Sequence, residues 1–306
     1  MLTAHNFSYG LLTPALAYLM SCLGAFLGLR CTARAMAATG RDRLGWLLLG
    51  ALSIGTTGIW VMHFIAMLGY TVPGQTIHYN VLITIGSMLI AVIVVGIGLL
   101  IVGFASRNWR NLLLAGTFTG VGVAAMHYSG MAAIRLPARM TYSPELFGLS
   151  VVIAVVAATA ALWAALNLRG ARATLGAALI MGVAVSGMHY TGMAAMHLFP
   201  PGVGGGMKMA GGGATAENFL LPLLIGISIL AFIMTATLAL SPTDEEIRAD
   251  AALLQRIEAA QGDRVGDPVG AAPIPQAPPV RAPATVISRA TQARRQAQRG
   301  EPYSRQ

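Results

Sequence analysis

Seven apolar stretches, each long enough to cross a lipid bilayer, occupy most of the first 240 residues. They run near 9–29, 44–69, 81–104, 112–134, 146–168, 174–198 and 219–240. A helix needs about 20 apolar residues to cross the hydrocarbon core of a bilayer. Charged residues make up only 10% of the chain, against about 25% in soluble domains. The sequence therefore predicts an all-α, polytopic membrane protein with seven transmembrane helices.

Basic residues in the connecting segments predict how these helices are oriented. Eight follow the first, third and fifth stretches, and three follow the even-numbered ones: Arg30, Arg34, Arg41, Arg43, Arg107, Arg110, Arg169 and Arg172, against Arg135, Arg139 and Lys208. Because cytoplasmic loops are enriched in Lys and Arg, we expect the N-terminus outside and the C-terminus in the cytoplasm. The formal charge of +9 belongs to these loops and does not indicate nucleic-acid binding. Trp60, Tyr70 and Trp109 are expected at the membrane interfaces.

The composition changes after residue 240. Residues 1–240 hold eleven basic and three acidic residues, whereas 241–306 hold nine and eight. We expect 1–240 to be the membrane domain and 241–306 to be a cytoplasmic tail. Acids near Ser241 indicate the start of a short helix over about 243–261. From Asp263 onward the chain is rich in Pro, Ala and Arg, which predicts disorder.

A short motif recurs three times inside the apolar stretches. The copies are Trp60-Val-Met-His-Phe-Ile-Ala-Met67, Ala125-Met-His-Tyr-Ser-Gly-Met131 and Gly187-Met-His-Tyr-Thr-Gly-Met193. Their histidines are 64 and then 62 residues apart, which is two membrane crossings. Copies separated by two crossings have the same orientation in the membrane, as in a parallel repeat. The chain is thus predicted to consist of three parallel two-helix repeats and a seventh helix.

The three motif histidines are expected at one depth. They lie six, seven and nine residues before the predicted ends of the second, fourth and sixth stretches. At about 1.5 Å per residue, this places them roughly 9–14 Å below the outer boundary. A pseudo-threefold arrangement of the helices would therefore bring the three imidazoles to a common axis.

Soft donors at this axis predict a metal site. Imidazole nitrogen and thioether sulfur favour copper, especially Cu(I). One histidine in an apolar helix is most often a packing residue, but three buried ones need polar partners, and the apolar stretches contain no acid. The His and the Met four residues later share a helix face, whereas the preceding Met lies on the flank. The first-rank ligands are His63, His127, His189, Met67, Met131 and Met193, and the second-rank ligands are Met62, Met126 and Met188. His197 is a weaker candidate near the outer surface.

These copies closely resemble the MHYT domain over about residues 9–240. The resemblance rests on Met-His-Tyr-Ser at 126–129, Met-His-Tyr-Thr at 188–191 and the Gly-Met that follows each. The first copy departs from the motif, with Phe64 in place of Tyr and Ile65 in place of Thr or Ser. The resemblance implies a sensory domain of the bacterial cytoplasmic membrane, with a copper site near the outer face that responds to oxygen, carbon monoxide or nitric oxide. Members of the family often carry a cyclic-di-GMP synthase or hydrolase domain behind the membrane part. Residues 241–306 are too few for one, so we expect no enzyme activity and a separate cytoplasmic signalling partner.

Three other functions remain open from the sequence. Three His ligands with one free position suit a catalytic zinc in a seven-helix membrane hydrolase, although the apolar stretches lack an acid to act as general base. Met and His also ligate haem, but three equivalent histidines fit a pair of axial ligands poorly. A copper transporter or assembly factor would need further ligands across the membrane. The oligomeric state is left open.

Overall fold

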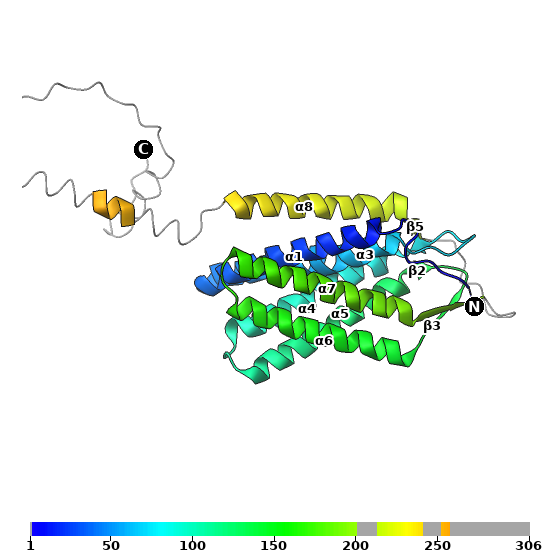
Figure 1. Cartoon of the computed structure of the whole chain (residues 1–306), viewed down its shortest axis with the longest axis horizontal. Coiled ribbons are helices and arrows are strands. Elements are labelled where there is room, and N and C mark those ends of the chain that lie inside the picture. The colour runs from blue at the N-terminus through cyan, green and yellow to red at the C-terminus, as the bar shows by residue number, and fades with distance from the viewer. Residues whose placement is uncertain (1, 201–212, 241–251, 258–306) are drawn as a thin grey trace, which may run out of the picture. The chain divides into compact units, whose positions relative to one another are not determined.

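Six long apolar segments lie side by side in the first part of the chain (Figure 1), and their contacts close into a ring. The computed structural model describes residues 2–200, 213–240 and 252–257, and the chain divides into two units, 1–241 and 242–306. The ring consists of α1 (Leu12–Ala37), a composite second segment, α4 (Val81–Phe104), α5 (Trp109–Ala132), α6 (Pro144–Asn167) and α7 (Ala171–Ala195). The second segment, which we call span 2, joins α2 (Gly40–Leu52), the π-helical η1 (Ser53–Val61) and α3 (Met62–Leu68). A further pair, η2 (Ala216–Leu220) and α8 (Leu221–Leu240), follows α7 along the chain.

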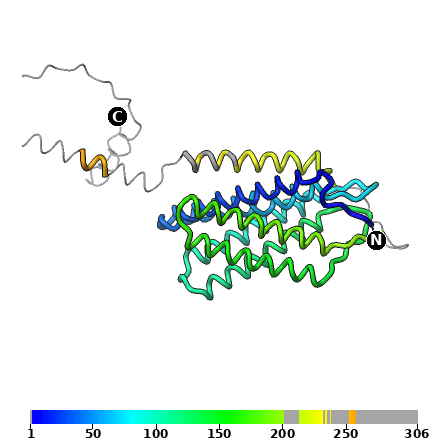
Figure 2. The backbone as a smooth tube through the Cα atoms, in the orientation of Figure 1, coloured from blue at the N-terminus to red at the C-terminus, as the bar shows by residue number. Residues whose placement is uncertain are grey.

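The ring closes because each segment packs on the next and α7 returns to α1. Span 2 lies between α1 and α4, and α5 lies between α4 and α6. The backbone tube in Figure 2 shows these segments running side by side. Helix α8 packs on α1 and η1, outside the ring (Figures 1 and 2). The three motif-bearing segments, span 2, α5 and α7, therefore alternate with α1, α4 and α6 around the axis.

Local sequence signals explain where several helices begin. The Asn80 side chain accepts a hydrogen bond from the Ile83 amide at the start of α4, and Asn108 accepts one from the Asn111 amide at the start of α5. Asparagine is a favoured N-cap because its side-chain oxygen satisfies a free amide of the first turn. Pro144 occupies the first position of α6, where the missing N–H has no cost.

Short strands connect the three repeats at the end of the ring where the motif helices terminate, which we call the strand end. β1 (His78–Tyr79) pairs with both β2 (Ile134–Arg135) and β5 (Ala214–Thr215). β3 (Arg139–Tyr142) pairs with β4 (Met196–Phe199). The first sheet thus joins the segments that follow all three motif helices. The opposite end, with the connections at 38–39, 105–108 and 168–170, we call the loop end.

The same backbone hydrogen bond closes each helix pair at the strand end. The amide before the first helix of the pair donates to the carbonyl six residues after the motif histidine. The three bonds are Ser8 N to Gly69 O (3.0 Å), Asn80 N to Ala133 O (2.8 Å) and Ser143 N to Ala195 O (2.9 Å). Equivalent bonds at equivalent positions are what a threefold repeat of helix pairs requires. The pairs are α1 with span 2, α4 with α5, and α6 with α7.

The all-helical prediction is confirmed, and six helices are long and apolar enough to cross a membrane. The predicted seventh crossing, 219–240, corresponds to η2 and α8, where the apolar helix measured over described residues is Ala216–Ala231. This is shorter than a bilayer needs, so a seventh crossing stays a prediction. In the second unit residues 252–257 are helical, and the rest of the tail predicted at 241–306 lies outside the described residues.

The first predicted span ended too early. Helix α1 continues to Ala37, eight residues beyond the predicted end, and therefore includes Arg30 and Arg34. Both had been expected in the connection after the helix. The Arg34 guanidinium lies over the Trp46 ring of α2, 5.1 Å from its centroid. A prediction from hydropathy ends this span before Arg30, the first arginine. In the structure α1 continues because the Arg34 side chain packs along the neighbouring helix α2.

Small residues allow close approach of the helices within the ring, as is usual between membrane helices. A Cβ placed on Gly120 of α5 would overlap the Val155 backbone of α6, and one on Gly116 would overlap Thr159. On α7, a Cβ on Gly182 would meet the Cys22 sulfur of α1 at 2.5 Å, whereas Gly187 has nothing within 4 Å. Only some of these glycines therefore set helix spacing.

We predict that Gly120→Ala lowers the free energy of unfolding by about 1–3 kcal/mol, because the new methyl must push α5 away from the α6 backbone. Gly148→Ala in α6 is the matched control, since a Cβ there has no neighbour within 4 Å. It should be neutral or stabilising by up to about 1 kcal/mol. Unfolding of the purified protein in mixed detergent micelles measures both, and equal stabilities would contradict the assigned packing of α5 on α6.

Candidate metal centre

The three motif histidines lie at one level near the strand end. His63 is in α3, His127 in α5 and His189 in α7, five or six residues before the last residue of each helix. At about 1.5 Å per residue, they lie about 8–9 Å inside the helix ends, slightly nearer than the sequence predicted. All three are buried, with exposed fractions of 0–1%. The common depth follows from the repeat itself.

Their imidazole rings converge on one point. The Nδ1 atom of His63 lies 3.0 Å from Nδ1 of His189 and 3.1 Å from Nδ1 of His127. Ring centroids are 4.9–5.1 Å apart, and each pair of planes meets at 81–89°. A ligand atom from each of the three lies within 4.8 Å of the others. We refer to these residues as the His triad.

The donor set of the triad fits a metal ion. Three nitrogens each about 2.0–2.1 Å from one ion lie roughly 3.3–3.6 Å from one another, so the separations of His63 Nδ1 from His189 Nδ1 and from His127 Nδ1 need to open by only a few tenths of an ångström. A neutral imidazole carries one N–H and one lone pair. With its proton on Nε2, each ring can direct an Nδ1 lone pair at the centre. Within the described residues, no carboxylate joins the group.

Two glycines of the motif leave the space that the imidazole rings of His63 and His127 occupy. A Cβ on Gly130 would lie 2.6 Å from Nε2 of His63, and one on Gly192 would overlap Nε2 of His127. Each glycine follows the histidine of its own copy by three residues but contacts the histidine of the preceding copy. These Nε2 atoms are buried and have no hydrogen-bond partner. The first copy has Ala66 at the corresponding position, so a methyl group replaces the third glycine.

An aromatic residue packs edge-on against each member of the triad. Phe64, Tyr128 and Tyr190 each follow their histidine, at centroid distances of 4.7–4.9 Å and interplanar angles of 79–90°. The Tyr128 hydroxyl also makes a 2.7 Å hydrogen bond with Ser150 of α6. Phe64 instead packs on Trp60, 4.8 Å away. The substitution of Tyr by Phe in the first copy therefore changes the polar surroundings but keeps the ring contact.

The six candidate methionines are all buried, with exposed fractions of 0–4%. They are Met62, Met67, Met126, Met131, Met188 and Met193. Met62 packs with Ala17 and Ala66 in a small cluster, and the other five belong to the main hydrophobic core. The second-rank methionines are thus as buried as the first-rank ones, because neighbouring helices cover the motif helices on the flank as well as at the axis. His197 lies in β4 opposite Thr141, outside the triad.

Trp60 and η1 are the site features that sequence reasoning missed. Trp60 was expected at a membrane interface but is fully buried, and its Nε1 donates to Ser87 Oγ (3.0 Å) and to the Thr84 carbonyl (3.2 Å) on α4. It is the second-last residue of the nine-residue π-helical segment that precedes α3. π-helical turns are rare and often occur at functional sites. The position of Trp60 inside the first motif copy was the available signal, and no sequence pattern predicted η1.

Comparison with known proteins identifies the repeat. The family described as "Bacterial signalling protein N terminal repeat", MHYT, matches residues 57–116 and 120–178. The chain is an MHYT-repeat protein. The two matched segments contain His63 and His127, and His189 follows them with the same motif and the same geometry. The family resemblance stated from the sequence is confirmed.

The chain is similar to one part of several larger signalling proteins. It is 39% identical over 252 residues to the bifunctional diguanylate cyclase/cyclic di-GMP phosphodiesterase MucR of Pseudomonas aeruginosa, covering 81% of this chain and 36% of MucR. It is 38% identical over 228 residues to the cyclic di-GMP phosphodiesterase NbdA of the same organism, covering 72% and 28%. The signalling protein YkoW of Bacillus subtilis is 29% identical over 206 residues, covering 64% and 25%. The chain thus spans about a third of the length of these relatives or less. No solved structure matches it significantly.

We predict that Gly192→Ala weakens binding of Cu(I) by about 10- to 100-fold, the usual effect of disturbing the support of a metal ligand. The added methyl would displace the His127 imidazole from its position against Gly192. Gly187→Ala, in the same motif copy, is the matched control because its Cβ would have no neighbour within 4 Å. Competition with a chromophoric Cu(I) chelator measures both affinities, and equal values would show that Gly192 does not position His127.

Proposed function

We propose that this MHYT domain is a membrane sensor that receives its signal at a copper ion held by His63, His127 and His189. The convergence of three Nδ1 atoms in the membrane interior carries this proposal. A membrane sensory role agrees with the signalling proteins to which the chain is similar. Buried imidazoles without acidic partners are costly in a bilayer, and one shared ion satisfies all three inward-facing nitrogens.

Charge supports Cu(I) over a divalent ion at this site. The Born cost of burying an ion rises with the square of its charge, and the cost is repaid only by close countercharges. The triad supplies three neutral donors and no carboxylate. A monovalent, soft ion therefore suits the site better than Zn²⁺. Met67, Met131 and Met193 are proposed as further ligands because thioether sulfur favours Cu(I), with Met62, Met126 and Met188 as substitutes.

The proposed sensor detects a small gas at the copper ion and passes the change to a cytoplasmic partner. Bound Cu(I) would supply an open coordination position for a diatomic gas such as oxygen, carbon monoxide or nitric oxide. The ring residues would then transmit the change, because binding that favours one packing of the helices shifts their equilibrium. We place the domain in the bacterial cytoplasmic membrane with the triad near the outer face, the N-terminus outside and residues 241–306 inside. The names of the relatives suggest cyclic-di-GMP signalling as the output, through a cytoplasmic partner.

A three-His zinc hydrolase is the second candidate function. Catalytic zinc commonly takes three protein ligands and leaves one position for water, which the triad could provide. A general base within hydrogen-bond reach is also needed, and no Asp or Glu of the described residues joins the triad. Haem is disfavoured because imidazole nitrogens 3.0–3.1 Å apart leave no room for a porphyrin between them.

We predict that purified, membrane-embedded protein contains one copper ion per chain and that His127→Ala reduces this to less than a tenth. The reason is that two nitrogens would remain where three converge. His197→Ala is the control, since His197 lies in β4 outside the triad. Elemental analysis by mass spectrometry gives the stoichiometry and distinguishes copper from zinc. An unchanged copper content in His127→Ala would refute the triad as the metal site.

The role of the methionines has its own test. Leucine replaces methionine with little change in volume, so Met67→Leu, Met131→Leu and Met193→Leu together remove the sulfurs and retain the packing. We predict loss of sulfur from the copper X-ray absorption spectrum and an affinity for Cu(I) lower by about tenfold or more. Met88→Leu in α4, which lies outside the three motif copies, is the control. A spectrum with nitrogen ligands alone in the unaltered protein would make these methionines packing residues.

A further inference from the structure

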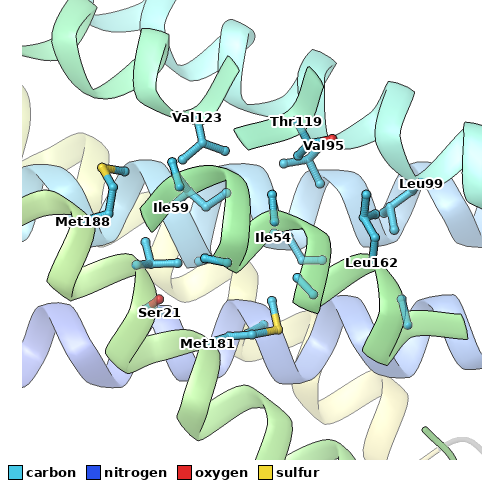
Figure 3. Close-up of a pocket in the computed structure, with 18 residues that line it drawn as sticks. Ser21, Ile54, Ile59, Val95, Leu99, Thr119, Val123, Leu162, Met181 and Met188 are labelled. Atoms are coloured by element: carbon cyan, nitrogen blue, oxygen red, sulfur yellow. The ribbon is translucent and has the colours of Figure 1, made fainter. Parts of the chain in front are cut away.

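An apolar cavity of about 60 Å³ lies inside the ring, and residues from all six membrane-spanning segments line it (Figure 3). One residue from each segment in chain order illustrates this: Ser21, Ile59, Val95, Val123, Ala158 and Val185. The cavity is therefore an internal feature of the bundle rather than a groove between two helices. Every segment therefore contributes to its walls.

The cavity adjoins the triad on the side facing the loop end. Ile59, Val123 and Val185 line it, and each lies four residues before its motif histidine. Four residues are about one helical turn, roughly 5–6 Å along the axis. Met188, next to His189, lines the same end. Figure 3 shows Met188, Val123 and Ile59 at one end of the cavity and Leu99 and Leu162 at the other.

The lining excludes ions and disfavours water. None of the eighteen lining residues is charged, and only Ser21 and Thr119 have polar side chains. The Thr119 hydroxyl already donates to the Val94 carbonyl, at 3.3 Å. A buried water molecule needs two to four polar partners, and apolar cavities without them stay dry and take up xenon or small hydrocarbons. A single hydroxyl cannot meet that need.

The size of the cavity limits the occupant further. A cavity of about 150 Å³ lined by apolar side chains accepts benzene, and the present one is less than half as large. We propose that this cavity is a binding chamber for one uncharged, apolar molecule of one to three heavy atoms, which reaches the triad from within the membrane. Molecules of this class dissolve in the bilayer, and the strands β1 to β5 lie on the opposite side of the triad. Its role as the chamber for the sensed ligand rests on the proposed function, whereas its capacity to bind such a molecule does not.

Occupancy of the chamber would be transmitted through helix packing. Interiors pack at nearly crystalline density, so a molecule entering the cavity adds contacts to the segments that surround it. The same position in each repeat, four residues before the histidine, touches both the chamber and the turn that holds the imidazole. The chamber and the triad are thus mechanically adjacent in every repeat.

Xenon provides a direct test, because it is apolar, spherical and visible by anomalous scattering. Crystals of the full chain, grown with and without copper, are pressurised with xenon. We expect one xenon atom per chain in the cavity in both preparations. In Ala158→Leu the larger side chain fills the cavity, and xenon occupancy should fall to background. Ala160→Leu, two residues later on the exposed side of α6, should bind xenon as the unaltered protein does.

Each result decides the proposal. Absence of xenon from the unaltered protein, or equal occupancy in Ala158→Leu, would overturn it, and so would density for a lipid or detergent chain in the cavity. If Ala158→Leu does not fold, Ala158→Val provides the smaller filling, with the same predicted loss. Xenon in a chain that never binds copper would support the chamber while refuting the copper site. Copper without xenon would do the reverse.

Discussion

The structure depends on three imidazoles that meet in the membrane interior without an acidic partner. In the bilayer each of them carries a desolvation cost that polar partners must offset. The Nδ1 atom of His63 lies 3.0–3.1 Å from those of His189 and His127, which fixes the angular position of three helices around one axis. The alternation of motif-bearing and supporting helices, and the sheet that joins the three connections, follow from holding those rings at one depth.

The threefold arrangement is maintained by backbone and glycine contacts as much as by the histidines. One hydrogen bond closes every helix pair six residues after its histidine. Gly130 and Gly192 lie against the imidazole of the preceding copy, so the second and third repeats each support the histidine of the repeat before. The first repeat is the exception, with Ala66 for glycine, Phe64 for tyrosine and a π-helical approach to His63. The surroundings of His63 therefore differ from those of His127 and His189.

The motif itself has three separable tasks in this arrangement. The histidine supplies the convergent nitrogen, the next residue packs its ring edge-on against that imidazole, and the glycine leaves space for the imidazole of the neighbouring copy. The valine or isoleucine one turn earlier contributes to the apolar chamber. The three buried histidines and the apolar cavity therefore lie on adjoining turns of the same three helices.

The sequence by itself determined the six long helices, the two-helix repeat and the common depth of the histidines, because apolar length and the spacing of 64 and 62 residues fix them. It also singled out the three histidines that converge. Only the tertiary structure decided that α1 continues past Arg30, that Trp60 is buried against α4, that η1 is π-helical, and that glycines of one copy seat the histidine of another. These features depend on which helix faces which and at what rotation, and a linear pattern does not record either. The chamber exists for the same reason, since it is the space that six neighbouring helices leave unfilled.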